Sequence, residues 1–120
     1  MPTGIIVDDA TIMRIRLREI LESEYEIVAE AGNGDEALEL CTKWKPDFVT
    51  LDISMPRTNG MEALKRIRES VPGTRIIMVS AVGQKRMVID ALQAGATDFV
   101  IKPFEPERVR KAIGRMFATG

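Results

Sequence analysis

The chain has 120 residues, enough for one domain with an ordinary core, and 45% of them are hydrophobic, which excludes a disordered tail or a collagen-like fibre. Its 17 basic and 18 acidic residues nearly cancel, so no basic excess points to a nonspecific nucleic-acid binder. Histidine is absent, which excludes Ser–His and Cys–His triads, histidine metal sites and a phosphohistidine relay within the chain.

Two further features bear on where the protein works. The single cysteine, Cys41, cannot form an internal disulfide, so we expect a reducing compartment. The N-terminal residues lack the basic start and long apolar run of a signal peptide, and no apolar stretch approaches the roughly 20 residues of a membrane span. We therefore expect a single cytoplasmic domain over residues 1–120 that has no contact with a membrane.

Five short apolar runs predict β-strands. They are mostly β-branched or aromatic, and they are continuous rather than alternating, which is typical of strands covered on both faces in a parallel sheet. In chain order, the runs are Ile5–Val7, Ile27–Ala29, Phe48–Leu51, Ile76–Val79 and Phe99–Ile101.

After each run, apolar residues recur at helical spacing and predict a helix. In chain order, these stripes are Met13, Leu17, Ile20 and Leu21; Ala37, Leu40, Cys41 and Trp44; Met61, Leu64, Ile67 and Val71; the segment Met87–Ala94; and Val109, Ala112, Ile113, Met116 and Phe117. We expect Asp9 to cap the first helix and Asn33 to open the second. Gly95 is expected to close the fourth helix, and Pro106 falls near the first turn of the fifth.

The order of these elements predicts an α/β fold. Strict alternation of strand and helix implies a parallel sheet between two layers of helices, joined by right-handed crossovers. Five strands suit the flavodoxin-like (βα)5 doubly wound parallel sheet with strand order 2-1-3-4-5. In that order the winding reverses between strands one and three, and ligands bind at the carboxyl ends of the strands beside this switch point.

Three acidic residues follow the two strands that flank the switch point. Asp8 and Asp9 come directly after the first strand, and Asp52 comes directly after the third. Their carboxylates repel one another unless a cation lies between them, and Mg²⁺ suits such oxygen ligands while keeping waters for a phosphoryl group. Taken singly, Asp9 is a helix cap and an aspartate at a strand end is ordinary turn chemistry. The three together favour a magnesium site.

Two residues at the ends of the fourth and fifth strands extend this set. Lys102 follows the apolar run of strand five, and its ammonium can reach toward the acids, where it would supply charge to a transferring phosphoryl group. The alternative is a lysine whose stem covers the end of the sheet. Ser80 by itself is a turn residue, and it gains interest because its strand would end beside Asp52.

These motifs, in this order and spacing, resemble the receiver domain of two-component response regulators over essentially the whole chain. The matching segments are Asp8-Asp9, Asp52 with Met55-Pro56 and Asn59-Gly60 behind it, Ser80-Ala81, and Lys102-Pro103-Phe104. The stretches Ser80–Gln84 and Phe104–Pro106 further resemble chemotaxis regulators of the stand-alone type.

The resemblance implies a role for each acid and for the lysine. Asp52 would be the phosphoacceptor. Asp8 and Asp9, together with Asp52 and the backbone carbonyl of Ser54, would hold Mg²⁺. Lys102 would pair with the phosphoryl oxygens.

The resemblance also implies a switch. Ser80 would be the switch hydroxyl, which moves inward to bond the phosphate, and Phe99 would be the switch aromatic, which fills the space that Ser80 vacates. The Lys102–Pro103 peptide bond would be cis. We expect the changed surface, and hence the partner-binding face, to be formed by the fourth helix, the fifth strand and the fifth helix. The alternative docking face is the first helix with its arginines.

The function implied is a phosphorylation-activated signalling switch of a two-component system, in chemotaxis or motility. A histidine kinase would donate the phosphoryl group, and the partners would include an effector such as a flagellar motor switch protein and a phosphatase. The protein would be a monomer without direct contact to nucleic acid. It would not be an enzyme beyond weak Mg²⁺-dependent self-phosphorylation from small phosphodonors and self-dephosphorylation.

Two alternatives stay open. The chain could be the isolated receiver domain of a transcription regulator, since only Ala118-Thr119-Gly120 follow the last predicted helix and a DNA-binding output domain is absent. A flavodoxin-type electron carrier shares the topology, but it needs a hydroxyl- and glycine-rich phosphate loop after strand one. Asp8-Asp9-Ala10-Thr11 places two negative charges there instead.

Overall fold

Strands and helices alternate along the chain in the computed structural model, which describes residues 1–55 and 59–117. Pro56 of the receiver motif and the terminal Ala118–Gly120 therefore lie outside the described residues. The strands are β1 Thr3–Val7, β2 Glu26–Ala31, β3 Phe48–Leu51, β4 Arg75–Ser80 and β5 Asp98–Ile101. The helices are α1 Thr11–Leu21, α2 Gly34–Trp44, α3 Gly60–Ser70, α4 Lys85–Gln93 and α5 Pro106–Phe117. Each predicted strand is confirmed, and so is each predicted helix.

The five strands form one parallel sheet in the order β2-β1-β3-β4-β5, which confirms the flavodoxin-like arrangement. Helices cover both faces of the central strands, so every residue of β3 is buried, as its continuous apolar sequence predicts. The strand β2 lies at one edge of the sheet, and most of its residues are only half-buried.

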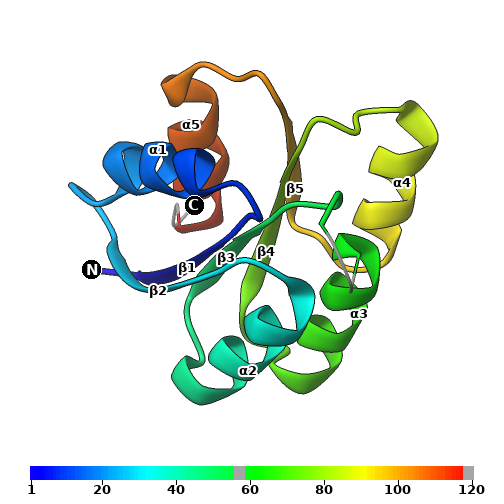
Figure 1. The fold of residues 1–120 in the computed structure, drawn as a ribbon, viewed down its shortest axis with the longest axis horizontal. Helices are drawn as coiled ribbons and strands as arrows, with labels where there is room; N and C mark the ends of the chain where they lie inside the picture. The colour runs from blue at the N-terminus through cyan, green and yellow to red at the C-terminus, as the bar shows by residue number, and fades with distance from the viewer. Residues whose placement is uncertain (56–58, 118–120) are drawn as a thin grey trace.

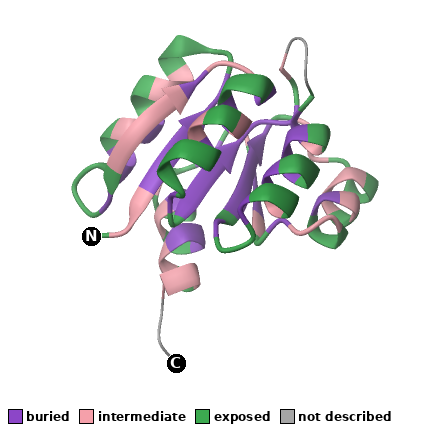
Figure 2. Cartoon of the chain, turned by 90° about the horizontal axis from the view of Figure 1, so that it is seen from below, coloured by how far each residue is buried: buried purple, intermediate pink, exposed green. Residues whose placement is uncertain are grey.

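Two layers of helices enclose the sheet (Figure 1). Leu17 of α1 and Ile113 of α5 pack into the core on one face, whereas Cys41 of α2, Leu64 of α3 and Ala91 of α4 pack into the core on the other. Figure 2 shows the buried residues concentrated in the sheet and on the inner sides of the helices, with the outer sides of the helices exposed. None of the helices in the described ranges has the length and hydropathy needed to cross a bilayer.

Two helices begin with an asparagine cap, and α1 does not. Asn33 and Asn59 each accept, through Oδ1, a 2.9 Å hydrogen bond from the backbone N–H three residues later, at the starts of α2 and α3. The prediction that Asp9 caps α1 is wrong, because the residue before this helix is Ala10, which makes no side-chain cap bond. The N–H of Ala10 instead donates to Oδ1 of Asp8, 2.9 Å away, so a tight turn at Asp8 precedes the helix.

The apolar stripe of α2 is buried at Ala37 and Cys41, half-buried at Leu40 and exposed at Trp44. Ala37 and Cys41 are fully buried, whereas Trp44 is 47% exposed, so the prediction that it joins the core stripe is wrong. The helix ends at Trp44, and Lys45 turns the chain in a left-handed conformation with φ of 46°. The indole therefore lies near the start of β3, away from the carboxyl ends of the strands.

Gly60 brings the start of α3 against the end of β3. A Cβ at this position would collide with the backbone carbonyl oxygen of Asp52 and with Ile53. The N–H of Gly60 donates to the carbonyl oxygen of Ile53 at 2.8 Å, which holds the two segments together. A residue without a side chain is therefore needed for this close approach behind Asp52.

Candidate functional site

The register between β1 and β3 brings the three acids together. Val7 pairs with Leu51 at the ends of these strands, so Asp8 and Asp52 follow from adjacent positions. Backbone bonds hold both residues: the N–H of Asp8 donates to Ala31, and the N–H of Asp52 donates to Val7. Asp8, Asp9 and Asp52 each offer a carboxylate oxygen, and these oxygens lie within 4.8 Å of one another. The predicted convergence of the three acids is confirmed.

Burial distinguishes the three carboxylates. Asp8 is 1% exposed and Asp52 is 5% exposed, whereas Asp9 is exposed at the mouth of the site. Oδ1 of Asp52 accepts a 3.2 Å hydrogen bond from the backbone N–H of Ser54. The site is thus an acidic cluster with two sheltered carboxylates and one exposed carboxylate.

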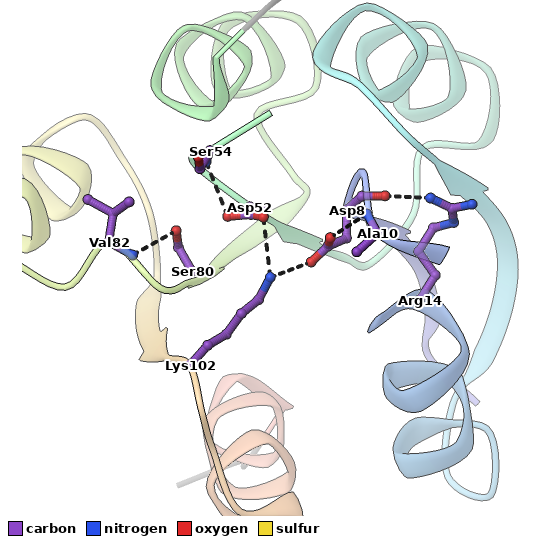
Figure 3. A network of polar contacts seen from close by, with 8 residues as sticks. All are labelled: Asp8, Ala10, Arg14, Asp52, Ser54, Ser80, Val82 and Lys102. Carbon is purple, nitrogen blue, oxygen red and sulfur yellow. Dashed lines mark hydrogen bonds and ion pairs between the residues drawn. The ribbon is translucent and has the colours of Figure 1, made fainter. Parts of the chain in front are cut away.

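Lys102 reaches the two buried acids from the end of β5 (Figure 3). Its Nζ donates to Oδ2 of Asp8 at 2.6 Å and to Oδ2 of Asp52 at 3.2 Å. Its backbone N–H donates to the carbonyl oxygen of Ser80, and the peptide bond to Pro103 is cis, as predicted. The chain thus turns at the end of the sheet so that the lysine side chain crosses toward β1 and β3.

The surroundings of Lys102 keep it charged. Burial by itself lowers the pKa of its ammonium, but the hydrogen bond to Asp8 and the charges of Asp52 and Asp8 outweigh this effect and raise the pKa above its ordinary value. One ammonium against three carboxylates leaves the cluster with a formal charge of −2. The remaining charge and the hard oxygen donors match a divalent cation such as Mg²⁺.

Ser80 and Phe99 lie on the neighbouring strands β4 and β5. Ser80 is fully buried, and its Oγ accepts a 3.3 Å hydrogen bond from the backbone N–H of Val82 in the loop before α4. Phe99 is 6% exposed and belongs to the core between the sheet and the α2–α4 layer. The carbonyl oxygen of Phe99 accepts a 3.0 Å hydrogen bond from Nη2 of Arg108. Figure 3 shows Ser80 at the end of β4 with its hydroxyl bonded to the loop before α4, whereas Phe99 lies in the core, three residues before Lys102.

Arg14 contacts the site without having been assigned to it from the sequence. Its Nη1 donates to the backbone carbonyl oxygen of Asp8 at 2.6 Å (Figure 3). In the sequence it stands outside the apolar stripe of its helix, where arginines are usually solvated, so no local pattern distinguishes it. Only the path of the chain from β1 into α1 brings this side chain back to Asp8.

Comparison with known proteins shows the family of the chain. Residues 5–114 match the family model described as the response regulator receiver domain. Chemotaxis protein CheY of Thermotoga maritima is 49% identical over 113 residues, which cover 93% of this chain and 94% of that protein. Chemotaxis protein CheY of Bacillus subtilis is 51% identical over 112 residues, which cover 92% of this chain and 93% of that protein.

A solved structure shares the fold closely. The CheX-CheY-BeF3-Mg+2 complex from Borrelia burgdorferi contains a chain that matches with a TM-score of 0.94 and 34% identity, covering 98% of this chain and 90% of that chain. These similarities favour a chemotaxis regulator over the receiver of a transcription regulator, and they exclude the flavodoxin-type electron carrier. The chain belongs to the response regulator receiver domain family, and it is a phosphorylation-activated signalling switch of the chemotaxis type rather than a metabolic enzyme.

Proposed function

We propose that Asp52 is the phosphoacceptor and that a histidine kinase is the donor. The observation that carries this proposal is the position of Asp52, buried within the acidic cluster and bonded to the ammonium of Lys102. A carboxylate oxygen of Asp52 attacks phosphorus, and the bond from phosphorus to the donor nitrogen breaks, with its electron pair leaving on that nitrogen. Since the chain has no histidine, the donor has to be another protein or a small phosphodonor such as acetyl phosphate.

Asp8, Asp9, Asp52 and the backbone carbonyl of Ser54 would hold Mg²⁺. The formal charge of −2 and the closeness of the three carboxylate oxygens support this assignment. Bound there, the cation would neutralise negative charge on the acids and on the phosphoryl oxygens. Lys102 already points at Asp52, and its ammonium can transfer a hydrogen bond from the carboxylate to a phosphoryl oxygen. The same groups support slow self-phosphorylation and self-dephosphorylation.

Ser80 and Phe99 would convert phosphorylation into a change of surface. The hydroxyl of Ser80 is bonded to Val82, so a phosphoryl group that draws the hydroxyl inward also releases the loop before α4. Phe99 on the next strand would then move into the space that Ser80 leaves. Phosphorylation can shift this equilibrium only by binding one arrangement better than the other, so the unphosphorylated form retains weak partner binding.

The partner-binding face would comprise α4, β5 and α5. Three large apolar side chains are exposed on this face: Ile89 and Leu92 of α4 are 41% and 44% exposed, and Ile101 of β5 is 48% exposed. Such residues on a soluble surface mark a docking site when they are grouped. We assign this face to the effector, such as a flagellar motor switch protein.

The helix α1 is the second candidate face. Ile12 and Ile15 are 75% and 48% exposed there, and this helix starts directly beside the acids. That position suits proteins that must reach the phosphoryl group, namely the kinase and a phosphatase. The single cysteine is a free, buried thiol, which fits work in the reducing cytoplasm.

The phosphoacceptor is tested with acetyl phosphate, with and without Mg²⁺, by intact mass spectrometry and peptide mapping. We expect a gain of one phosphoryl group, of mass about 80 Da, at Asp52 only when Mg²⁺ is present, because phosphoryl transfer depends on charge neutralisation. Asp52→Asn should gain none. Asp47→Asn is the matched control, since Asp47 stands at the opposite end of the same strand and should leave labelling unchanged.

Two results would contradict the assignment. One is stoichiometric labelling of Asp52→Asn at a residue that is not a neighbouring hydroxyl. The other is labelling of the wild type at the same rate in the presence of a chelator. Fluorescence of Trp44 is a poor reporter for this experiment, because the indole lies at the far end of α2.

A further inference from the structure

Arg14 binds three separate parts of the chain around the acids. Its Nη1 donates to the backbone carbonyl oxygen of Asp8 at 2.6 Å, and its Nη2 donates to Oγ1 of Thr11 at 3.2 Å. Its Nε lies 3.3 Å from Oε1 of Glu30 on β2. The side chain is 20% exposed, so these contacts are partly sheltered from water.

The turn that presents Asp8 and Asp9 leads into α1, which has no side-chain cap. Ala10, the residue before the helix, cannot supply one. The other polar groups of Asp8 are already engaged: its N–H donates to Ala31, Oδ1 accepts from Ala10, and Oδ2 accepts from Lys102. The guanidinium of Arg14 binds the carbonyl oxygen, and so restricts rotation of the peptide that joins Asp8 to Asp9.

Glu30 orients the guanidinium of Arg14 toward the carbonyl oxygen of Asp8. Its carboxylate pairs with Nε of Arg14 through Oε1 and with Nε of Arg18 through Oε2, at 3.3 and 2.7 Å. Both arginines lie on α1 and share Glu30, yet the contact to Asp8 comes from Arg14. Arg18 therefore offers a matched control that perturbs the same ion-pair network.

We propose that Arg14 is a positioning residue for the acidic site: it fixes the backbone of Asp8 so that the carboxylates of Asp8 and Asp9 are presented together to a divalent cation. This inference rests on the proposed magnesium role of these acids. A planar guanidinium binds two acceptors at once, which a lysine ammonium does not reproduce in the same geometry. Charge alone predicts the opposite effect on Mg²⁺ affinity. A nearby guanidinium repels Mg²⁺, so removing the guanidinium would tighten Mg²⁺ binding.

The test compares Mg²⁺ affinity, measured by titration calorimetry with MgCl₂, among wild type, Arg14→Gln, Arg14→Lys and Arg18→Gln. We expect both Arg14 variants to raise the Kd, by about tenfold for Arg14→Gln, which is the size of effect seen when an outer partner of a metal ligand is lost. Arg18→Gln should stay close to wild type. Two results would overturn the proposal. One is equal Mg²⁺ affinity in Arg14→Gln and wild type. The other is tighter Mg²⁺ binding by Arg14→Gln together with wild-type affinity in Arg14→Lys.

A second readout needs no metal. The N–H of Ala10 donates to Oδ1 of Asp8, so hydrogen exchange of this amide in chelator should be faster in the Arg14 variants and unchanged in Arg18→Gln. Equal acceleration in all variants would mean a merely structural role and would overturn the proposal. If Arg14→Gln does not fold, the Mg²⁺ titration and the hydrogen exchange are both measured on Arg14→Lys. A wild type that binds no Mg²⁺ would instead remove the proposed metal site itself.

Discussion

At the scale of single residues, the site is held together by one cation among buried anions. Lys102 is 15% exposed and contacts both Asp8 and Asp52, which are almost fully buried. Carboxylates of this kind are costly to bury unless a positive charge compensates them. Lys102 therefore has a structural role in the metal-free protein in addition to the phosphate-binding role proposed for it.

Replacing this lysine should have an effect that depends on Mg²⁺. In chelator, Lys102→Ala should lower the free energy of unfolding by about 1–3 kcal/mol, because two buried carboxylates lose their shared hydrogen-bond donor. Saturating Mg²⁺ should narrow this difference from wild type, since the metal supplies positive charge to the same oxygens. Urea unfolding followed by circular dichroism measures both quantities.

The matched control is Lys65→Ala, which removes an exposed lysine of α3 and should change stability little under either condition. Unfolding of Lys102→Ala at the wild-type urea midpoint in chelator would show that the lysine contributes nothing to the metal-free fold.

Cys41 is a buried thiol whose titration should affect stability at alkaline pH. Burial raises its pKa to about 12, and the residue is fully buried. A raised pKa means that, as the pH rises, the unfolded chain releases the thiol proton before the folded chain does. The contribution of the neutral thiol to folding stability is therefore complete below the unfolded pKa of about 9 and is lost as the pH rises toward 12. Over that window the loss is about 1.4 kcal/mol per pH unit.

We therefore expect the free energy of unfolding of wild type to fall more steeply than that of Cys41→Ala between pH 9 and 10.5, in urea titrations. Iodoacetamide at pH 8 should label Cys41 in urea and leave the folded protein unlabelled. Labelling at equal rates in both states would mean that the thiol is accessible in the folded protein, contrary to its burial.

At the scale of elements, helix starts differ in how their amide groups are satisfied. The start of α2 carries reciprocal bonds: Asn33 accepts from the N–H of Glu36, while the Glu36 carboxylate accepts from the N–H of Gly32 and from the side-chain amide of Asn33. At the start of α1, Oδ1 of Asp8 accepts from the N–H of Ala10, and no side chain caps the helix. The helix α4 also begins without a side-chain cap, so this feature is shared by the helices that follow Asp9 and Ser80.

The cap of α2 gives a prediction about stability alone. Asn33→Ala should lower the free energy of unfolding by about 1 kcal/mol, because the N–H of Glu36 loses its acceptor. Asn33→Asp keeps an acceptor oxygen and should lie near wild type. Phosphorylation by acetyl phosphate should be unaffected in both variants, since this cap does not contact Lys102 or the acids. An Asn33→Ala protein as stable as wild type in urea would contradict the role of the cap.

The exposed edge of β5 is closed by side chains. Asp98 accepts from the N–H of Phe99 at 2.7 Å, and Arg108 donates to the carbonyl oxygen of Phe99 while lying 3.6 Å from the Asp98 carboxylate. These contacts occupy backbone groups that would otherwise be free to pair with another chain at the sheet edge. They also tie α5 to the backbone of the proposed switch residue.

At the scale of the whole molecule, the site and the proposed partner face share β4 and β5. Ser80 ends one strand and Lys102 follows the other, and the loop after Ser80 leads into α4. Gly83 of this loop packs against Ile101, where a Cβ would meet the isoleucine side chain at 2.8 Å. Movement of Ser80 is thus expected to reach the exposed apolar residues of α4 and β5 through this loop.

Amide chemical shifts measured with and without beryllofluoride and Mg²⁺ test this coupling. We expect changes at Asp8, Asp9 and Asp52, and also over residues 81–92 and 99–112. Asp52→Asn with the same additives is the control and should show no change in the second region. Shifts confined to α1, α2 and α3, with residues 81–92 and 99–112 unmoved, would contradict the proposed face and favour docking on α1.

Much of the fold could be predicted from the sequence because strict alternation of strand and helix leaves few topologies. Continuous apolar runs locate every strand, and the strand order is predicted because five strands suit the flavodoxin-like one of the common doubly wound orders. Residues that follow adjacent strands at the same edge of a sheet converge, so the sequence places Asp8 and Asp52 together. Lys102 follows β5, which is separated from β3 by β4, and it reaches both acids through its long side chain.

Tertiary structure decided the contacts that side chains make with groups on other parts of the chain. Asp9 is exposed and does not cap α1, because the residue before this helix is Ala10, whose amide is bonded to Asp8. Trp44, the last residue of α2, is exposed, although its spacing fits the stripe that contains Ala37 and Cys41. Arg14 reaches the carbonyl oxygen of Asp8 because α1 folds back over the end of β1. Spacing along one element predicts which residues share a face, but the partner of each polar group is set only when the elements pack.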